Sequence, residues 1–534
     1  MLAECRDSGE AGKWSPLDVT MEEKKSLEHV ECEQSPAKAH ATTDYEHEQH
    51  LTLKEVARKH PKLILWTFFW CMCALGWGFD TQVNGSIIGV PSFRSYYGET
   101  FQGDAVIPAE WLSAFNITSS VGQFFGGFAC SWVADRIGRK KSLSIGVIIV
   151  TGGIFGETWS STRAAFVVSK LILGVGVGFY LTLGPITCSE FSPVVLRGYT
   201  TSGVNLAIAM GQLISNSVTK GFGDRVDVWG FRAPFLVQLV FSILLFTGSI
   251  FSPESPYYLV QRGCIDEARK ALQRLYGSDF DVEPKLDTIR ATVEAEACCD
   301  KASYALAFQG TNRIRTLISM GVFACQHFAG IIFVLSFSTY FFQLAGLSTS
   351  NAFDLGVGLT ACGVAGNICS WFLVHRLGRR PIFLGGMLAC TTILFLIGIM
   401  DVIPTNSAKW AMSSLTVVYS FVYFLTIGAV AFVLLGEVSS VTLRARTTAL
   451  ATATQAIFGI IMFFAVPYMV NPDAGNLKGK VGFIFGGLSL AATIVCFFYI
   501  PELRGKTNAE IDTMFQKHVQ PRKMGSYHDD EFIS

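Results

Sequence analysis

Long apolar runs recur along the chain from Leu63 onward, and short polar segments separate them. A helix of about 20 residues, rising ~1.5 Å per residue, crosses the hydrocarbon core of a bilayer. Helices also satisfy their own backbone hydrogen bonds, as lipid requires. The pattern therefore predicts an all-α membrane protein with twelve membrane-spanning helices, at 63–89, 111–133, 143–162, 164–189, 201–222, 233–252, 315–343, 352–374, 382–403, 410–436, 447–470 and 481–500.

The polar segments divide the chain into five predicted parts. The first is polar throughout and has no apolar periodicity, which favours a disordered tail. A longer polar insert lies between the sixth and seventh spans, and its residues 266–276 have the pattern of an amphipathic helix. The parts are an N-terminal tail (1–61), an N-terminal six-helix bundle (62–252), a helical linker (253–314), a C-terminal six-helix bundle (315–500) and a C-terminal tail (501–534).

Basic residues in two short loops predict the orientation in the membrane. One loop follows the second span and the other follows the eighth; they hold Arg136, Arg139, Lys140 and Lys141, and Arg376, Arg379 and Arg380. Short loops rich in Lys and Arg stay on the cytoplasmic side. With an even number of spans, the linker and both termini are then cytoplasmic as well.

The composition argues against several classes of protein. The chain has 534 residues, of which 16% are charged and 50% hydrophobic, and its formal net charge is zero. Ordinary soluble domains carry about 25% charged residues, and nucleic-acid-binding proteins carry a basic stripe. The sequence has no nucleophile–base constellation and no metal-type ligand spacing, so we predict no enzyme, no metal site and no organic cofactor. The composition implies membrane lipid as a partner, but neither nucleic acid nor an obligate protein partner.

The two halves of the chain repeat each other in sequence. The segment DRIGRKK (135–141) recurs as HRLGRRP (375–381), and SEFSPVVLRG (189–198) recurs as GEVSSVTLRA (436–445). Two spans further on in each half, PESP (253–256) is echoed by PELRGKT (501–507). A parallel repeat of six spans is typical of transporters, whose substrate site lies near the membrane midplane between the halves.

These motifs resemble those of the sugar porters of the major facilitator superfamily from about Leu63 to Thr513. GWGFDTQVNG (76–85) and GQLISNSV (211–218) add to the resemblance. Within that family, three stretches are most similar to fungal α-glucoside (maltose-type) permeases: FSTYFFQLAG (337–346), CGVAGNICSW (362–371) and AEIDTMFQKHVQPRKM (509–524). The resemblance implies two six-helix repeats and secondary transport by alternating access.

Charged residues cluster where the repeated motifs meet the cytoplasmic face. Glu190 and Glu437 end the fourth and tenth spans beside the arginine loops, so they are expected to pair with Arg139 and Arg379. The resemblance implies a gating network that holds the transporter outward-open; the alternative is a set of charges that only fixes the topology. The network would comprise Asp135, Arg139, Glu190, Arg197, Glu254, Arg379, Glu437 and Arg444. His375 replaces Asp135 in the second repeat.

Asp80 and Lys170 are charged residues inside predicted spans, where charges are costly and usually functional. Counted along their helices, both lie roughly 24–30 Å from the cytoplasmic side. The resemblance implies that Asp80 faces Lys170 and exchanges the coupling proton. Lys170 stands where the family has Arg, and a lysine ammonium is a point charge. Glu157, near the outer end of the third span, is expected to face the lipid headgroups.

Sugars bind to side-chain amides and to apolar or aromatic faces. The resemblance places a sugar site at Trp77, Gln212, Gln326, His327, Phe432 and Gln455. Each glutamine has the alternative role of a bond between helices. Two family asparagines are missing, since Ile332 and Gly363 occupy their positions, and Asn367 lies one turn beyond the second.

The leading prediction is a plasma-membrane symporter that imports an α-glucoside or related sugar, with the proton as the coupling ion. Two alternatives stay open. One is a uniporter or exporter of another small polyhydroxylated compound. The other is a sensor on the same fold, which the short segment after Thr513 disfavours.

Overall fold

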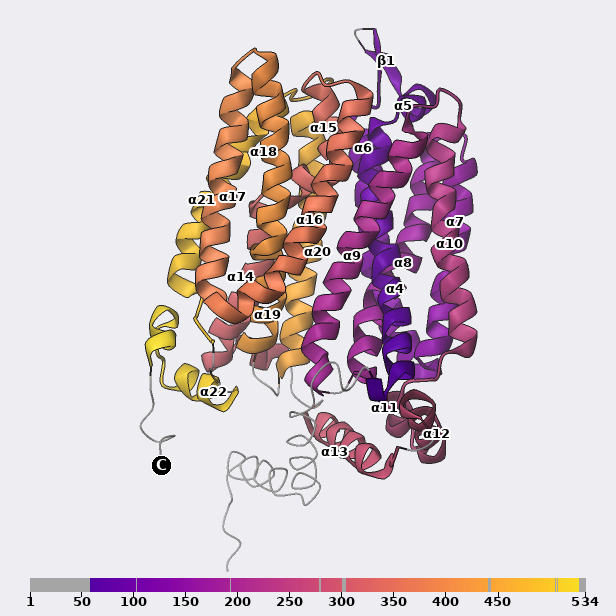
Figure 1. Cartoon of the computed structure of the whole chain (residues 1–534), viewed down its shortest axis with the longest axis vertical. Coiled ribbons are helices and arrows are strands. Elements are labelled where there is room, and N and C mark those ends of the chain that lie inside the picture. The colour runs from indigo at the N-terminus through magenta and orange to yellow at the C-terminus, as the bar shows by residue number, and fades with distance from the viewer. Residues whose placement is uncertain are drawn as a thin grey trace, which may run out of the picture.

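The computed structural model describes residues 58–527, apart from 102, 193, 278–279, 300–303, 440–442, 505 and 507. Nearly all of the predicted N-terminal tail therefore lies outside the described residues. The described chain is almost entirely helical, and its one sheet is the antiparallel hairpin of β1 (Glu99–Phe101) and β2 (Asp104–Val106). Figure 1 shows the helices as two bundles side by side, indigo to magenta for the first and orange to yellow for the second.

The first bundle contains six long helices. They are α4 (Pro61–Ser86), extended by η1 (Ile87–Gly89), α6 (Ala109–Ile137), α7 (Arg139–Trp159), α8 (Arg163–Phe191), α9 (Val194–Gly223) and α10 (Trp229–Phe251). The short helix α5 (Pro91–Tyr97) precedes the hairpin. Each of the six predicted spans in this half falls on one of these helices.

The second bundle follows the same plan, but two of its six paths are broken. Its continuous helices are α16 (Thr349–Leu377), α17 (Arg379–Val402), α20 (Arg444–Val470) and α21 (Val481–Tyr499), which η5 (Lys478–Lys480) precedes. The broken paths are α14 (Gly310–Phe328), η3 (Ile332–Ser336) and α15 (Ser338–Leu344), and then α18 (Asn406–Leu425) with α19 (Ile427–Val438).

The two breaks contradict the prediction of continuous helices at 315–343 and 410–436, and each has a local backbone cause. Gly330 has a φ of +82°, which a right-handed helix does not contain. Thr426 has φ −121° and ψ −83°, also outside the helical region. In broken helices, freed backbone groups can line an internal site.

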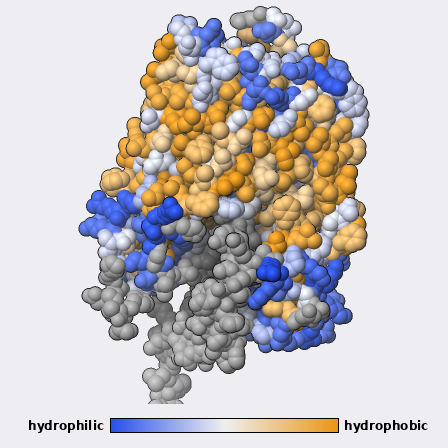
Figure 2. Space-filling model, in the orientation of Figure 1, coloured by the Kyte–Doolittle hydropathy of each residue, from blue (hydrophilic) through white to orange (hydrophobic). Residues whose placement is uncertain are grey.

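Nine helical segments in the described part of the chain are long and apolar enough to cross a membrane. The other three predicted spans fall on α6, on α9 and on the broken path of α14 and α15; α6 and α9 have 29 and 30 residues. The surface agrees, because on the face shown in Figure 2 hydrophobic residues cover the middle of the molecule and hydrophilic residues gather toward both ends. The prediction of an all-α membrane protein is confirmed.

The linker lies at one end of the bundles and the hairpin at the other (Figure 1). The linker contains α11 (Pro256–Gln261), α12 (Ile265–Tyr276), α13 (Glu283–Cys299) and η2 (Tyr304–Phe308), and α12 confirms the predicted amphipathic helix. We call these two ends the linker end, which is the predicted cytoplasmic side, and the hairpin end.

Part of the predicted C-terminal tail packs on the second bundle. It forms α22 (Asn508–Gln516) and η6 (Pro521–Ser526). Arg315 at the start of the bundle lies 2.5 Å from Asp512, and its guanidinium lies 4.9 Å from the Phe515 ring. The described residues of this segment, as far as 527, therefore pack on the bundle.

The two bundles are held together at the hairpin end. Gln343 donates to the Gly89 carbonyl at 2.8 Å, and Asn216 donates to the Gly356 carbonyl at 2.9 Å. Lys220 forms an ion pair with Asp354 across the same boundary. At the linker end, no hydrogen bond or ion pair joins the bundles within the residues that the structure describes. The two bundles are thus in contact on the predicted outer side of the membrane.

Candidate functional site

Each bundle carries a charged cluster at its linker end. Arg139 Nη2 lies 2.9 Å from Glu190 Oε1, and Arg379 Nη2 lies 2.5 Å from Glu437 Oε1. Asp135 contributes weakly, because its side chain is largely exposed and 3.7 Å from Arg139. The predicted pairing of arginine with glutamate is confirmed in both repeats. Both pairs join helices within one bundle.

Two other predicted members of the network, and the histidine that replaces Asp135 in the second repeat, have side chains outside the described part of the structure. They are Arg197 near the start of α9, His375 near the end of α16 and Arg444 at the start of α20. Their roles in the gating network stay predictions.

A second glutamate in each cluster binds the first turn of a helix. Glu254 Oε1 accepts from the backbone N–H of Arg139 at 2.8 Å. In the other repeat, Glu502 accepts from the backbone N–H groups of Arg379 and Arg380, both at 3.1 Å. A carboxylate at a helix N-terminus satisfies unpaired N–H groups and complements the helix dipole. Each glutamate thus fastens the segment after the sixth span of its bundle to the helix that follows the arginine motif.

The glycine of each arginine motif makes room for that glutamate. Gly138 and Gly378 have φ values of +94° and +89°, which favour glycine. A Cβ at Gly138 would lie 2.5 Å from Glu254 Oε2, and one at Gly378 would lie 2.6 Å from Glu502 Oε2. The glycine and the glutamate of each repeat therefore form one structural unit.

Gly138→Ala is expected to lower the melting temperature of the purified protein. The strained backbone alone costs about 1–3 kcal/mol, and the new methyl group displaces Glu254 from the start of α7. Thermal unfolding followed by size-exclusion fluorescence measures the loss. Gly152→Ala on the same helix is the matched control, because a Cβ there meets no atom within 4 Å. Equal melting temperatures for the two variants would contradict the expectation.

Arg139→Ala is expected to slow transport about fivefold or more while the protein still inserts, since contacts that differ between two conformations are typically worth ~1–3 kcal/mol. The substitution leaves Glu190 without the ion pair that it makes here. Initial uptake per molecule at the cell surface measures the effect. Arg163→Ala, which breaks an exposed pair with Glu99, serves as the control. Unchanged uptake kinetics for Arg139→Ala would indicate that these charges only fix the orientation of the helices in the membrane.

A second charged group is buried inside the first bundle. Lys170 Nζ on α8 lies 2.5 Å from Glu157 Oε2 on α7, and it also donates to Asn84 Oδ1 on α4. Gln238 on α10 donates to Glu157 Oε1 at 3.2 Å. Glu157 is fully buried. The prediction that it faces the headgroups is therefore wrong, because α7 packs against α8 at this level and turns Glu157 inward.

Asp80 lies beside this group but does not form the ion pair. It is fully buried, and neither carboxyl oxygen has a hydrogen-bond partner within the described residues. Lys170 is its charged neighbour, and the neutral Asn84 amide also approaches the carboxyl group, without a hydrogen bond of good geometry. The implied proximity of Asp80 to Lys170 is correct, but in this conformation the salt bridge of Lys170 goes to Glu157.

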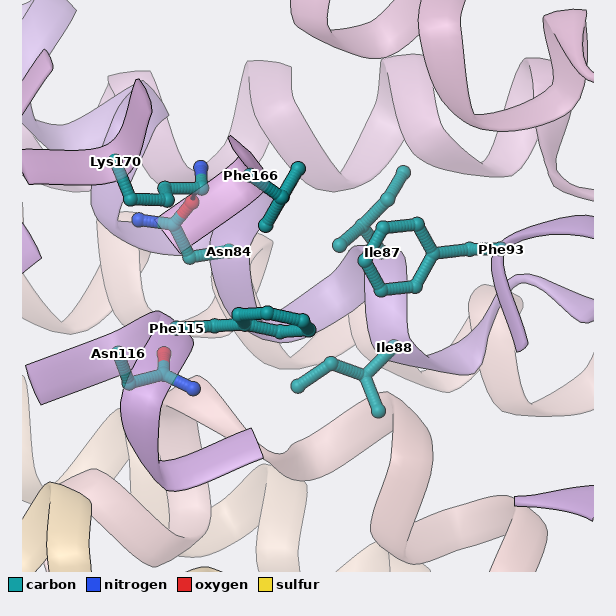
Figure 3. Close-up of a pocket in the computed structure, with 8 residues that line it drawn as sticks. All are labelled: Asn84, Ile87, Ile88, Phe93, Phe115, Asn116, Phe166 and Lys170. Atoms are coloured by element: carbon teal, nitrogen blue, oxygen red, sulfur yellow. Dashed lines mark hydrogen bonds between the residues drawn. The ribbon is translucent and has the colours of Figure 1, made fainter. Parts of the chain in front are cut away.

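A small cavity of about 10 Å³ opens beside Lys170 toward the hairpin end. Figure 3 shows Lys170 and Asn84 together at one side of it. Asn116 and apolar side chains complete the lining; these are Ile87, Ile88, Phe93, Phe115 and Phe166. The volume is about that which one water molecule requires.

The predicted sugar-binding residues of the second bundle gather around α14. Gln326 accepts a hydrogen bond from the Tyr423 hydroxyl at 3.0 Å, and its Nε2 has no hydrogen-bond partner among the described residues. Both ring nitrogens of the adjacent His327 are buried, and neither makes a hydrogen bond of good geometry within the described residues, although the Gln455 backbone lies near the ring. Native structures pair nearly all such atoms with protein, water or ligand. Gln326 and His327 therefore have hydrogen-bonding capacity left for a ligand.

Aromatic and polar side chains of neighbouring helices lie next to these two residues. Phe432 on α19 is 39% exposed, and its ring packs edge-on against Phe323, one turn before Gln326, with the centroids 5.3 Å apart. His327 also faces α20, where a Cβ on Gly459 would lie 3.7 Å from its ring. Gln455, one turn earlier on α20, is half-buried.

The two predicted residues of the first bundle lie on adjoining helices. Trp77 on α4 donates to Gln123 at 3.2 Å, and Gln212 on α9 is buried. Within the described residues, no hydrogen bond joins either of them to the second bundle. Asn367 is buried, and its amide nitrogen has no hydrogen-bond partner among the described residues. It could therefore replace the missing family asparagine as a ligand of the sugar.

Sequence reasoning missed five residues of these sites. Three had a readable signal: Glu157 is an intramembrane carboxylate, Asn84 lies one helical turn after Asp80, and Glu502 repeats Glu254. Gln238 and Tyr423 had none, because only the packing of α10 on α7 and of α18 on α14 places them.

Comparisons with known proteins cover nearly all of these elements. Residues 66–515 match the family described as Sugar (and other) transporter. The general alpha-glucoside permease of Saccharomyces cerevisiae is 29% identical over 489 residues, which are 90% of this chain and 79% of the permease. The MFS transporter fmqE of Aspergillus fumigatus is 28% identical over 520 residues, which are 94% of this chain and 97% of that protein.

A solved structure has the same fold. A partially occluded inward-open conformation of the xylose transporter XylE from E. coli superposes with a TM-score of 0.69 at 21% identity, covering 84% of this chain and 100% of that chain. The relatives are transporters, which supports the prediction that this chain is not an enzyme. The family match extends from the first membrane helix to α22, so this chain is a multi-pass membrane protein of the Sugar (and other) transporter family, within the major facilitator superfamily.

Proposed function

We propose that this protein imports an α-glucoside or related sugar by proton symport, through alternating access, at the plasma membrane with both termini in the cytoplasm. The observation that carries the proton-coupling part is the group of ionisable side chains inside the first bundle. Asp80, Glu157 and Lys170 are all buried at the depth of the membrane helices. Ionisable groups in such places usually serve ion or proton movement. The proton is the proposed coupling ion, and no other cofactor is invoked.

The half-buried and buried side chains of the second bundle support a sugar as the cargo. A sugar ring offers hydroxyl groups to amides and imidazoles, and C–H faces to aromatic rings. Gln326 and His327 have unused donors or acceptors, and Phe432 offers an aromatic face nearby. A relative named general alpha-glucoside permease directs the choice of sugar class. Trp77, Gln212 and Gln455 would complete the site from the first bundle and from α20.

The distribution of contacts between the bundles supports alternating access. Within the part of the chain that the structure describes, the hydrogen bonds and the ion pair that cross between the bundles all lie toward the hairpin end, as with Lys220 and Asp354. Among the described residues, Arg139 and Arg379 at the linker end form ion pairs only with acidic residues of their own bundle. An outward-open form would reverse this pattern: the hairpin-end contacts break, and the charged clusters face one another.

The test is uptake of labelled maltose, trehalose and glucose by a yeast strain that lacks its own sugar transporters. We expect maltose or trehalose to accumulate above its outside concentration, and a protonophore to collapse the accumulation. Equilibration without accumulation, unaffected by the protonophore, would replace the symporter with a uniporter. Uptake of none of the three sugars would overturn the α-glucoside class and favour another polyhydroxylated cargo.

A further inference from the structure

Glu157 is a buried acid to which the sequence resemblance gives no role. It lies two residues before the end of α7, where α7 and α8 approach each other closely. A Cβ on Gly153 would lie 2.6 Å from Leu173 Cα, and one on Gly156 would lie 2.5 Å from Ser169 Oγ. The two glycines thus bring the end of α7 against α8, and this contact holds Glu157 next to Lys170.

The surroundings of Lys170 are complete without Asp80. Its ammonium contacts Glu157 and Asn84, and the rings of Phe166 and Phe235 lie 5.3 and 4.8 Å away. Gln238 fixes the other oxygen of Glu157. The ion pair therefore has its charge balanced and most of its hydrogen bonds satisfied inside the bundle.

The balance of charge in this buried group determines whether Asp80 is ionised or neutral. The buried group contains two carboxyl groups and one ammonium, so ionisation of both acids would bury an uncompensated negative charge. Such a charge is costly in a low-dielectric interior, and a group without partners takes its neutral form instead. Glu157 has the ammonium, while within the described residues the oxygens of Asp80 make no hydrogen bond of good geometry and have only the neutral Asn84 amide beside them.

We propose that Glu157 is the second counter-ion of Lys170 and makes proton binding at Asp80 an exchange of ion pairs. The inference rests on the proposed proton symport. When a proton from water adds to the Asp80 carboxylate, one O–H bond forms and the site gains one positive charge. The ammonium keeps its three N–H bonds and moves from Asp80 to Glu157. When the site opens to water and Asp80 releases the proton to it, the ammonium returns to Asp80, and the hydrated site again carries one net negative charge.

The remaining polar groups around Glu157 do not compete for this role. Asn84 and Gln238 are neutral amides, on α4 and α10. Tyr97 on α5 lies in the electrostatic range of Glu157, and Arg232 of α10 acts on Tyr97 in turn. Burial raises the pKa of Tyr97 to about 12, and its hydroxyl bonds to the Ser160 carbonyl at 2.9 Å. Tyr97 therefore stays neutral at working pH.

Glu157→Gln tests the exchange in the full-length protein. With Glu157 neutral, Asp80 becomes the sole counter-ion of Lys170 and holds its charge more firmly. We expect the pH at half-maximal uptake to move toward acid by about one to two pH units, with counterflow retained. Glu157→Asp keeps the charge and should restore the original profile. Glu110→Gln, an exposed acid at the start of α6, is the control for an acid-to-amide change.

A pH profile of Glu157→Gln equal to that of the unmodified protein, with counterflow intact, would overturn the inference and leave Glu157 as a static partner of Lys170. Failure of the proposed function looks different: the unmodified protein itself would show no accumulation and no response to a protonophore.

A second measurement needs neither transport nor the Glu157 variant. Infrared spectroscopy of the purified protein detects the carbonyl stretch of a buried protonated carboxyl group as the pH falls. The proposal assigns that band to Asp80, so it must vanish in Asp80→Asn. Persistence of the band in Asp80→Asn would place the proton on another acid and overturn the proposal, even if Glu157→Gln does not fold.

Discussion

Asp80→Asn is expected to abolish proton-driven accumulation of sugar, while binding and exchange of sugar continue. Asparagine has the shape of protonated aspartate but carries no proton that it can release. Asp80 is fully buried in α4 beside Lys170, without a hydrogen-bond partner of its own in the described structure. The side chain therefore fits the neutral form, and an amide is tolerated at this place.

The loss is specific to net transport. A symporter must release its proton inside before it returns empty, and a permanently neutral side chain stays in the loaded form. Movement of the loaded form in both directions is all that counterflow requires. Because an unchanged Glu157 still neutralises Lys170, we expect the variant to fold and to bind sugar normally.

Proteoliposomes allow both activities to be measured on one preparation. An imposed pH difference drives accumulation in the first assay, and labelled sugar exchanges against unlabelled sugar in the second. Asp227→Asn, in the exposed turn before α10, makes the same chemical change away from the site. Accumulation by Asp80→Asn against a sugar gradient would remove Asp80 as the coupling residue. Loss of counterflow as well would indicate a damaged protein rather than an uncoupled one.

The positions of the membrane helices were predictable because burial in lipid selects long apolar runs. Even α6 and α9, which are less apolar than the other long helices, were predicted from the length of their apolar runs. The breaks after Phe328 and Leu425 were not found. Hydropathy carries no information about backbone dihedral angles. An apolar run therefore has the same hydropathy whether its helix is continuous or is interrupted at Gly330 or Thr426.

The sequence predicted most of the charged residues that belong to the sites, but only some of the ion pairs that they form. The repeat places Arg139 with Glu190 and Arg379 with Glu437, since equal spacing in two halves implies equal geometry. Glu157 was misplaced, because depth was judged from the end of an apolar run. Its actual neighbour depends on the close approach of α7 to α8 at Gly156, which linear sequence does not show.

Gln326→Ala is expected to raise the KM for the transported sugar by roughly five- to 150-fold, which corresponds to a lost hydrogen bond worth about 1–3 kcal/mol. Gln326 is buried on α14 with one amide atom held by Tyr423 and the other free. An amide fixed in this way presents its free N–H group in a set direction, as a sugar hydroxyl requires. Surface expression should be unchanged.

The alternative role for Gln326 is a bond between α14 and α18 through Tyr423. The two roles separate when KM and thermal stability are measured together. A bond between helices stabilises the empty protein, so its loss lowers the melting temperature and leaves KM unchanged. A sugar ligand acts only when sugar is present, so its loss raises KM and abolishes the stabilisation that added sugar gives.

Thr391→Val provides the matched comparison for that separation. Thr391 joins α17 to α21 through Ser489 at 2.7 Å, a buried polar contact in the same bundle. Its loss should lower stability without changing KM. If Gln326→Ala behaves like Thr391→Val in both measurements, Gln326 serves helix packing, and the sugar site must lie elsewhere between the bundles.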